Sequence, residues 1–443
     1  LPQLTLVFIE NLARGDGTIV LLQHHSYFEF VKILRLLAFE SVLFDRCVQV
    51  LIHFALIEKS GNENNSNSSR TTLRSLFFLY LSGSHASIEQ RAGVINKLIF
   101  SDMHQENELG LSLLEAALES EHFSSFYEFD FGARTRDYGL HPKIQQDIIH
   151  WYTAFVNLIT GLALSDKVIA TQARSIFAKK LPGLWLKVRI VKLLEESILK
   201  IHNHTAGQWS DGWIALHRTL KNEKALSEQD LLEVTLELEK KIRPVSLVDL
   251  SCSLLLLKPY QYIDMANKYS KDDDISGRLQ ETNELVESIA QEVAQDQSAL
   301  DMLLPKVCNM PHTRQEFFGV GLARGCNDKL LLWKKLISQF DITPIAERNL
   351  SILCGFLSGC SKEEPLIYNK IMDDAVDNRI IGEYFPILQA TPGIDKNSLE
   401  RLHKSLSLNI AKVDTFIRLA NGGIPKSVSD DDLANLLEKL LSK

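Results

Sequence analysis

The sequence predicts an all-α fold, namely an α-solenoid of stacked helix pairs, and three observations support this prediction. Apolar residues recur at helical spacing along most of the 443 residues. Strictly alternating strand patterns are nearly absent, and Gly, Pro or Asn interrupts the leucine-rich segments at intervals of roughly fifteen to twenty residues. A single helix pair of this size cannot bury its apolar face alone, so neighbouring pairs are expected to stack.

The N-terminal half holds the longest apolar segments with helical spacing. Helices are expected within residues 28–58, 109–120 and 147–164. LFFLYLSGSHASIEQRAGVINKLI, around Gly83, is predicted to form a helix, a glycine turn and a second helix. KSGNENNSNSSRTT (residues 59–72) is too polar to pack, and we expect this loop to be mobile or disordered.

The C-terminal third shows an internal repeat. GVGLARGCNDKLLLWKKLI, ILCGFLSGCSKEEPLIYNKIM and PILQATPGIDKNSLERLHKSL place Gly325, Gly359 and Gly393 at intervals of 34 residues. Each copy is predicted to be a helix stopped by glycine, a polar turn and a second amphipathic helix, similar in length to TPR or HEAT-type units. FIRLANGGIPKSVSDDDLANLLEKLL is expected to be a degenerate fourth copy.

Two regions are expected along the chain. Residues 1–205 would form an irregular helical array, and residues 206–443 would form the more regular repeats, ending in a polar cap at DDDLANLLEKLLSK. The boundary is placed in IHNHTAGQWSDGW (residues 201–213). The chain begins at Leu1 within a helical pattern and without an initiator methionine, so we expect a piece of a longer protein.

The composition indicates a cytoplasmic location. The formal net charge of -8 gives no reason to expect nucleic acid or an anionic membrane surface as a partner. Six cysteines in 443 residues lack the density of a disulfide scaffold, which favours reduced thiols. No apolar run reaches the roughly 20 residues needed to span a bilayer.

The motifs of the common enzyme and metal sites are absent or incomplete. The sequence contains neither a phosphate-binding loop nor a zinc-protease helix. KDDDISG (residues 271–277) resembles half of a calcium loop, but Asn283 stands where the bidentate glutamate is required. A metal cluster would need the following five residues: Cys308, His312, Cys326, Cys354 and Cys360. A structural role, in which the cysteines are small buried side chains, explains them better. No catalytic residue, cofactor or metal ligand is therefore predicted.

FDFGARTRDYGLHP (residues 129–142) is the candidate site for partner binding. Its side chains of interest are Arg134, Arg136, Asp137, Tyr138 and His141. Such a loop can bond the exposed ends of helices, because guanidinium donors satisfy terminal carbonyls and an aspartate can cap the next helix. The same residue types can grip a carboxylate, a phosphate or a peptide. The sequence leaves open whether the loop is a structural joint or a contact surface.

The N-terminal half also resembles a known family. LRLLAFESVLFDRCVQVLIHFALIE, a polar break, TTLRSLFFLYLSGSHASIEQRAGVINKLI, ELGLSLLEAALES and FGARTRDYGLHPK resemble the helical region downstream of the nucleotide-binding module in bacterial antiviral STAND-type NTPases, the Avs class. This resemblance covers about the first half of the chain. It implies a sensor that binds a phage protein by shape, after which the ATPase core oligomerises and activates an effector.

Three hypotheses follow for the function. The first is a ligand-sensing helical repeat region of an antiphage defence protein, without enzymatic activity of its own, whose ATPase and effector modules lie outside this chain. The second is a scaffold or adaptor α-solenoid that holds the subunits of a complex together. The third is the helical portion of a defence enzyme, for instance an NAD-cleaving one, whose active domain lies elsewhere.

Overall fold

In the computed structural model, the regular elements of the described residues are helices, which confirms the all-α prediction. The structure describes residues 2–14, 27–58, 68–121, 123–125, 127–220, 229–263, 275–308, 314–421 and 428–441. Within these ranges the one β-type contact is an isolated bridge between Phe131 and Arg134. None of the described helices is long and apolar enough to cross a membrane.

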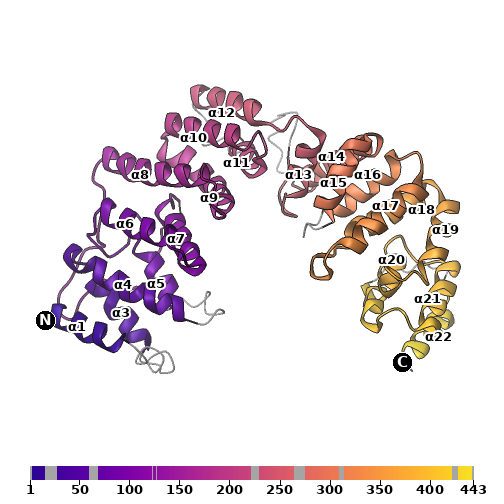
Figure 1. Cartoon of the computed structure of the whole chain (residues 1–443), viewed down its shortest axis with the longest axis horizontal. Coiled ribbons are helices and arrows are strands. Elements are labelled where there is room, and N and C mark those ends of the chain that lie inside the picture. The colour runs from indigo at the N-terminus through magenta and orange to yellow at the C-terminus, as the bar shows by residue number, and fades with distance from the viewer. Residues whose placement is uncertain are drawn as a thin grey trace. The chain divides into compact units, whose positions relative to one another are not determined.

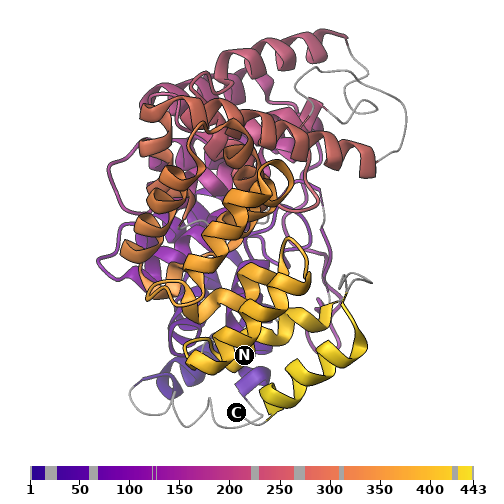
Figure 2. The same ribbon diagram turned by 90° about the vertical axis from the view of Figure 1, so that its right-hand side faces the viewer.

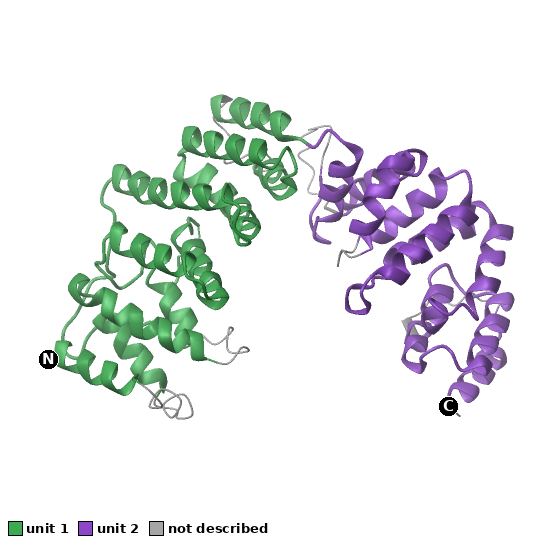
Figure 3. Cartoon of the chain, in the orientation of Figure 1, with its two compact units in different colours: residues 1–243 green, residues 244–443 purple. Residues whose placement is uncertain are grey.

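The chain divides into two compact units, Leu1–Arg243 and Pro244–Lys443 (Figure 3). The division therefore lies after residue 243, whereas the sequence analysis placed it after residue 205. The residues between these positions belong to the first unit because buried indoles tie them to it. Trp185 Nε1 donates to Thr235 Oγ1 at 2.9 Å, and the Trp209 ring stacks on that of Phe177 with centroids 6.0 Å apart.

Glu239 is a buried carboxylate held by several donors. Trp213 Nε1 donates to Oε1 at 2.7 Å. Arg243 donates to the carboxylate through Nε (3.0 Å) and Nη2 (2.7 Å), and His217 Nδ1 lies 3.5 Å from Oε1. Burial alone would raise the pKa of Glu239, but the bonds from His217, Arg243 and Trp213 outweigh burial and lower this pKa to about 2. The charged form of Glu239 therefore stabilises the end of the first unit.

Figure 1 shows the order of the helices, and Figure 2 shows the same ribbon turned by 90°. The helices of the first unit are α1 (Pro2–Leu12), α3 (Tyr27–Leu37), α4 (Ser41–Ile57), α5 (Ser69–Ser75), α6 (Ile88–Ile99), α7 (His104–Ala117), α8 (Gln145–Ala163), α9 (Ala170–Gly183), η1 (Leu184–Val188), α10 (Val191–His204), α11 (Ser210–Leu220) and α12 (Gln229–Ile242). The expected helices within residues 28–58, 109–120 and 147–164 are all present.

The unit expected around Gly83 is only half correct. Its second helix is α6, which begins with a capping box formed by Ser87 and Gln90. Its expected first helix is absent, because α5 ends at Ser75 and residues 76–87 are irregular. Leu81 and Gly83 both have positive φ angles, 60° and 66°, which a helix does not allow.

The polar run of residues 59–72 is only partly described. Residues 59–67 lie outside the described ranges, so the expectation of mobility is not addressed there. Ser68 caps α5 by accepting a hydrogen bond from the main-chain nitrogen of Thr71 at 3.1 Å. The end of the run is therefore helical, because a Ser followed by helix-compatible residues forms an N-cap.

The second unit contains the predicted helix pairs. Its helices are α13 (Leu247–Leu255), α14 (Ile275–Gln295), α15 (Gln297–Val307), α16 (Gln315–Gly325), α17 (Lys329–Ile342), η2 (Ile345–Glu347), α18 (Ser351–Glu363), α19 (Pro365–Ala375), η3 (Gly382–Tyr384), α20 (Phe385–Ala390), α21 (Lys396–Leu408), η4 (Val413–Asn421) and α22 (Asp430–Leu441). The pairs α16/α17, α18/α19 and α20/α21 coincide with the three copies. The fourth copy contains η4 and α22.

Glycines in α16 and α18 act as close-packing positions more than as helix stops. Gly359 lies inside α18, where an added Cβ would press on the side chain of Ala323. Gly325 is the last residue of α16, and its Cβ would meet the main chain of Gln291 in α14. α16 ends at Gly325 as predicted, and Gly393, with φ +109°, lies in the turn after α20, whereas Gly359 does not end its helix. The glycines thus let α14, α16 and α18 stack with their backbones in close approach.

Candidate partner-binding site

The candidate loop, residues 129–142, connects α7 to α8 and packs on the irregular segment before α6. Two main-chain hydrogen bonds join them: Gly83 N donates to Tyr138 O at 2.8 Å, and Leu140 N donates to Ser84 O at 2.9 Å. Gly139 has φ +85°, and a Cβ there would collide with the main chain of Ser84. Glycine is therefore required where the two irregular segments meet.

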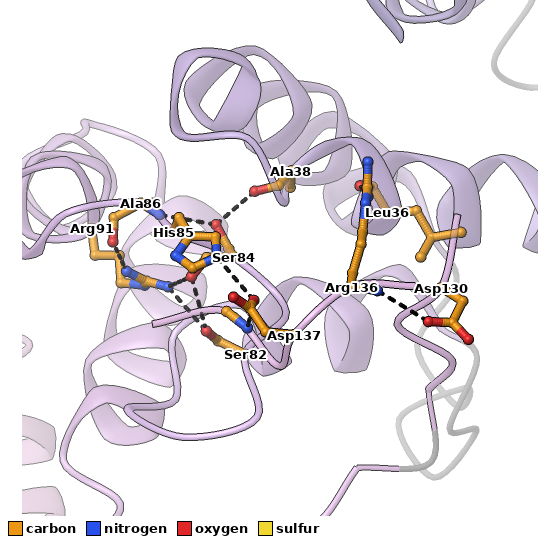
Figure 4. Close-up of polar contacts among 11 residues, drawn as sticks. Leu36, Ala38, Ser82, Ser84, His85, Ala86, Arg91, Asp130, Arg136 and Asp137 are labelled. Atoms are coloured by element: carbon orange, nitrogen blue, oxygen red, sulfur yellow. Dashed lines mark hydrogen bonds and ion pairs between the residues drawn. The ribbon is translucent and has the colours of Figure 1, made fainter. Parts of the chain in front are cut away.

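Arg136 bonds the end of a helix, as the joint interpretation predicts (Figure 4). Its Nη1 donates to Leu36 O, one of the last carbonyls of α3, at 2.6 Å. Its guanidinium carbon lies 4.4 Å from the ring centroid of Phe39 and 4.7 Å from that of Phe131. Burial lowers the pKa of Arg136, and the side chain is only partly exposed.

Asp137 fixes the loop to the segment before α6. Its Oδ1 accepts a hydrogen bond from Gly139 N at 2.9 Å. The same oxygen lies 2.9 Å from His85 Nε2 (Figure 4). His85 is in turn bonded to the end of α3, because its main-chain nitrogen donates to Phe39 O at 3.0 Å. Asp137 thus caps a turn of its own loop instead of the next helix.

Four of the five candidate side chains are exposed, namely those of Arg134, Asp137, Tyr138 and His141, and Asp137 is the one of these that is bonded to the segment before α6. Tyr138 is 57% exposed, and its ring meets Phe129 edge to face with centroids 4.9 Å apart. His141 is exposed and lies against Tyr80 at 5.4 Å between centroids. The Arg134 side chain is exposed and forms no hydrogen bond or ion pair with another residue that the structure describes, while its main chain closes the turn with Phe131. The loop therefore combines a joint with an exposed face.

Two buried arginines beneath the loop, Arg91 and Arg35, were not predicted from the sequence. Arg91 is fully buried and donates to Leu76 O at 2.9 Å, to Ser82 Oγ and Ser84 O at 3.2 Å, and to Ala86 O. Burial lowers the pKa of Arg91 to about 9. The one signal in the sequence is its spacing from Ile95 and Leu98, which places Arg91 on the apolar face of α6.

Arg35 holds the same segment from the side of α3. It is 2% exposed and lies between the rings of Tyr127 (4.3 Å to the centroid) and Phe129 (5.0 Å). Its nitrogens donate to Ser75 Oγ at 3.3 Å and to the carbonyls of Ser82 and Glu128 at 3.4 Å. Burial lowers the pKa of Arg35 to about 10. Both arginines therefore satisfy carbonyls that no helix or strand satisfies.

A polar groove of about 560 Å³ lies in the second unit, beside the start of α18. Arg348 on one wall donates to the carbonyls of Thr343 (3.0 Å) and Asp341 (2.8 Å) and lies over the Phe340 ring at 5.1 Å. Arg418, which also lines the groove, is exposed. Arg348 is thus committed to the local fold, and Arg418 is the cation that faces solvent.

The imagined metal cluster is not assembled in the described residues. There, no group of three or more His, Cys, Asp or Glu side chains is placed to hold a metal ion. Cys326 and Cys360 are buried, and burial raises the pKa of both thiols, that of Cys360 to about 12. They pack as small apolar groups, as expected. His312 and residues 271–274 of the half calcium loop lie outside the described ranges.

No family model, curated protein sequence or solved structure matches this chain. The all-α architecture is established by the helices themselves. Function must be argued from the surfaces that those helices and loops present.

Proposed function

We propose that this chain is a non-catalytic protein-recognition region, and that residues 129–142 contribute its contact loop. In the setting implied by the resemblance to STAND-type defence proteins, the partner is a phage protein. Binding would then be relayed to an ATPase and effector module outside this chain, with oligomerisation on activation.

The observation that supports the proposal is that some side chains of the loop are bonded to neighbouring elements while others face solvent. Arg136 and Asp137 are bonded to the ends of α3 and to the segment before α6, while Arg134 and Tyr138 face solvent. Arginine and tyrosine are the residue types most enriched among the energetically dominant positions of protein interfaces. A braced loop presents them with little conformational entropy left to lose on binding.

The stacked helix pairs of the second unit are consistent with the same role. Arrays of this kind offer long surfaces that contact folded partners and need no catalytic residues. A scaffold or adaptor function would use the same surfaces, so the identity of the captured partner separates the two hypotheses. A scaffold binds a cellular protein whether or not the cell is infected, and a sensor binds a phage-encoded one.

The test is capture by the purified, immobilised chain from lysates of infected and uninfected bacteria, across a diverse panel of phages. We expect a phage-encoded protein to be retained, and retention to be lost in the variant Arg134→Ala/Tyr138→Ala. The matched control is Arg218→Ala/Tyr260→Ala, which removes an exposed arginine and a 64% exposed tyrosine elsewhere. Failure to retain any phage protein across the panel would refute the sensor function.

A further inference from the structure

A groove of about 490 Å³ lies between α4 and α6 and reaches the first turn of α7. Val48, Ile52 and Leu56 of α4 line one wall and share one helix face, because they are spaced four residues apart. Val94 and Leu98 of α6 line the other wall with the same spacing. Two apolar stripes on adjacent helices form the kind of groove that accepts an amphipathic helix.

The face of α4 that lines the groove differs from the face that packs in the core. Phe44, Cys47, Leu51 and Phe54 on the core side are fully buried. Of the apolar groove residues of α4, Val48 is fully buried, while Ile52 and Leu56 are half-buried. Together with the half-buried Val94 of α6, Ile52 and Leu56 leave a strip of apolar surface in the groove that the core does not cover.

The open space at Gly93 is a second observation that supports a binding role for the groove. It lies inside α6 and lines the groove, and a Cβ built on it meets no heavy atom within 4 Å. By contrast, a Cβ on Gly110, Gly321 or Gly355 would collide with a neighbouring helix. A glycine weakens a helix interior, and the packing of this chain does not demand one at position 93. At this position in the groove wall, the missing side chain lets a partner approach the backbone of α6 closely.

The charges around the groove indicate the chemistry of the partner. The carboxylates of Asp45, Glu89 and Glu106 line the groove, and Lys97 is the one lysine among its lining residues. None of the three carboxylates forms an ion pair with another residue in the described ranges. A hydrogen bond from Ser87 lowers the pKa of Glu89, so this group is charged at neutral pH. The rim is therefore net negative.

We propose that this groove binds an amphipathic helix of a partner protein, with apolar side chains at i, i+3 or i+4 and i+7 and with lysine or arginine beside them. The groove lining on α4 runs from Asp45 to Leu56, about 16 Å of helix, enough for roughly three turns of the partner. The inference rests on the proposed protein-recognition function and names a second contact surface and the class of its ligand.

The test is selection of binders to the full chain from a display library of 20-residue helical peptides with randomised apolar and charged positions. Selected peptides are then measured by fluorescence anisotropy against wild type, Gly93→Leu and Gly161→Leu. Gly161 is the matched control, because it also lies in a helix, α8, and its Cβ also meets nothing within 4 Å, but it does not line the groove.

We expect the selected peptides to be amphipathic and net basic, to bind Gly93→Leu at least ten-fold more weakly than wild type, and to bind Gly161→Leu unchanged. Recovery of no peptides, of net acidic peptides, or of peptides that bind Gly93→Leu as well as wild type would overturn the proposal. Selected peptides that bind Gly93→Leu as well as wild type, while wild type still captures a phage protein, would overturn only the groove assignment. Capture by neither, with peptide binding intact in wild type, would overturn only the sensor function.

Discussion

Substitution of Arg136 should reduce stability, whereas substitution of Arg134 should reduce partner binding, although the two arginines are separated by one residue. Arg136→Ala removes a charge-assisted hydrogen bond to Leu36 O and two contacts with aromatic rings. A hydrogen bond from a charged group contributes about 1.5–3 kcal/mol. A partly exposed cation over a ring contributes about 0.5–1 kcal/mol. Because Arg136 is only half-buried, we take the lower end of these ranges and expect a loss of about 2–3 kcal/mol.

For a unit of this size, such a loss lowers the melting temperature by roughly 4–12 °C. Arg134→Ala removes an exposed side chain and should change stability by less than about 0.5 kcal/mol. Thermal unfolding followed by far-ultraviolet circular dichroism, together with capture of the partner, measures both properties in each variant. Arg134→Ala is expected to lose binding and keep its melting temperature.

A conservative variant separates the charge of Arg136 from its shape. Arg136→Lys keeps a cation near Leu36 O but cannot lie flat between Phe39 and Phe131, so we expect it to recover only part of the lost stability. If Arg136→Ala melted at the wild-type temperature, or if Arg134→Ala were equally destabilised, the division of the loop into a joint and an exposed face would be wrong. The double variant Arg134→Ala/Arg136→Ala is accordingly expected to be destabilised by the loss of Arg136.

Two further predictions concern glycine packing and pH. Gly355→Ala places a Cβ against the main chain of Glu316 and should cost about 1–3 kcal/mol, while Gly93→Ala should stabilise by about 0.5–1 kcal/mol, as urea unfolding midpoints can show. Equal effects of the two would contradict the packing described. Because the folded pKa of Glu239 is depressed from 4.5 to about 2, its contribution, on the order of 2–3 kcal/mol, is present above pH 4.5 and is lost as pH falls toward 2. Glu239→Gln should flatten this part of the stability profile, and an unchanged acid slope would show that Glu239 is not responsible.

The helix pairs could be predicted because their signals are local. Pro365 begins α19, and Asp395 caps α21 by accepting from Ser398 N at 2.7 Å, so the turns within the repeats are determined by neighbouring residues. The role of Gly359 could not be predicted in the same way. Its partner, Ala323, lies in the preceding repeat, and a glycine near a helix end has the same local pattern whether it stops the helix or packs it.

The irregular segment before α6 shows the limit of periodicity. The apolar run from Leu76 to Leu81 fits a helix as well as it fits a buried loop, since both bury leucine and phenylalanine. What decides between them is the supply of donors for its carbonyls. Arg91 donates to Leu76 O at the start of this run and to the carbonyls of Ser84 and Ala86 after it. An arginine in a helix is ordinarily a surface residue, so its burial is not predicted from the sequence.

Both units contain buried arginines that satisfy the main-chain carbonyls of irregular segments, and this feature connects the fold to the proposed function. Arg314 donates to Leu257 O at 3.0 Å and to Lys258 O at 2.8 Å in the second unit, as Arg91 and Arg35 do beneath the candidate loop in the first. A guanidinium has five donors in a fixed plane, so one side chain can satisfy several carbonyls of a segment that has no helix or strand. Segments held in this way lose their freedom during folding instead of during binding. Arg134 and Tyr138 project from the loop that packs on such a segment, through the bonds Gly83 N to Tyr138 O and Leu140 N to Ser84 O, and are therefore placed to contact a partner at small entropic cost.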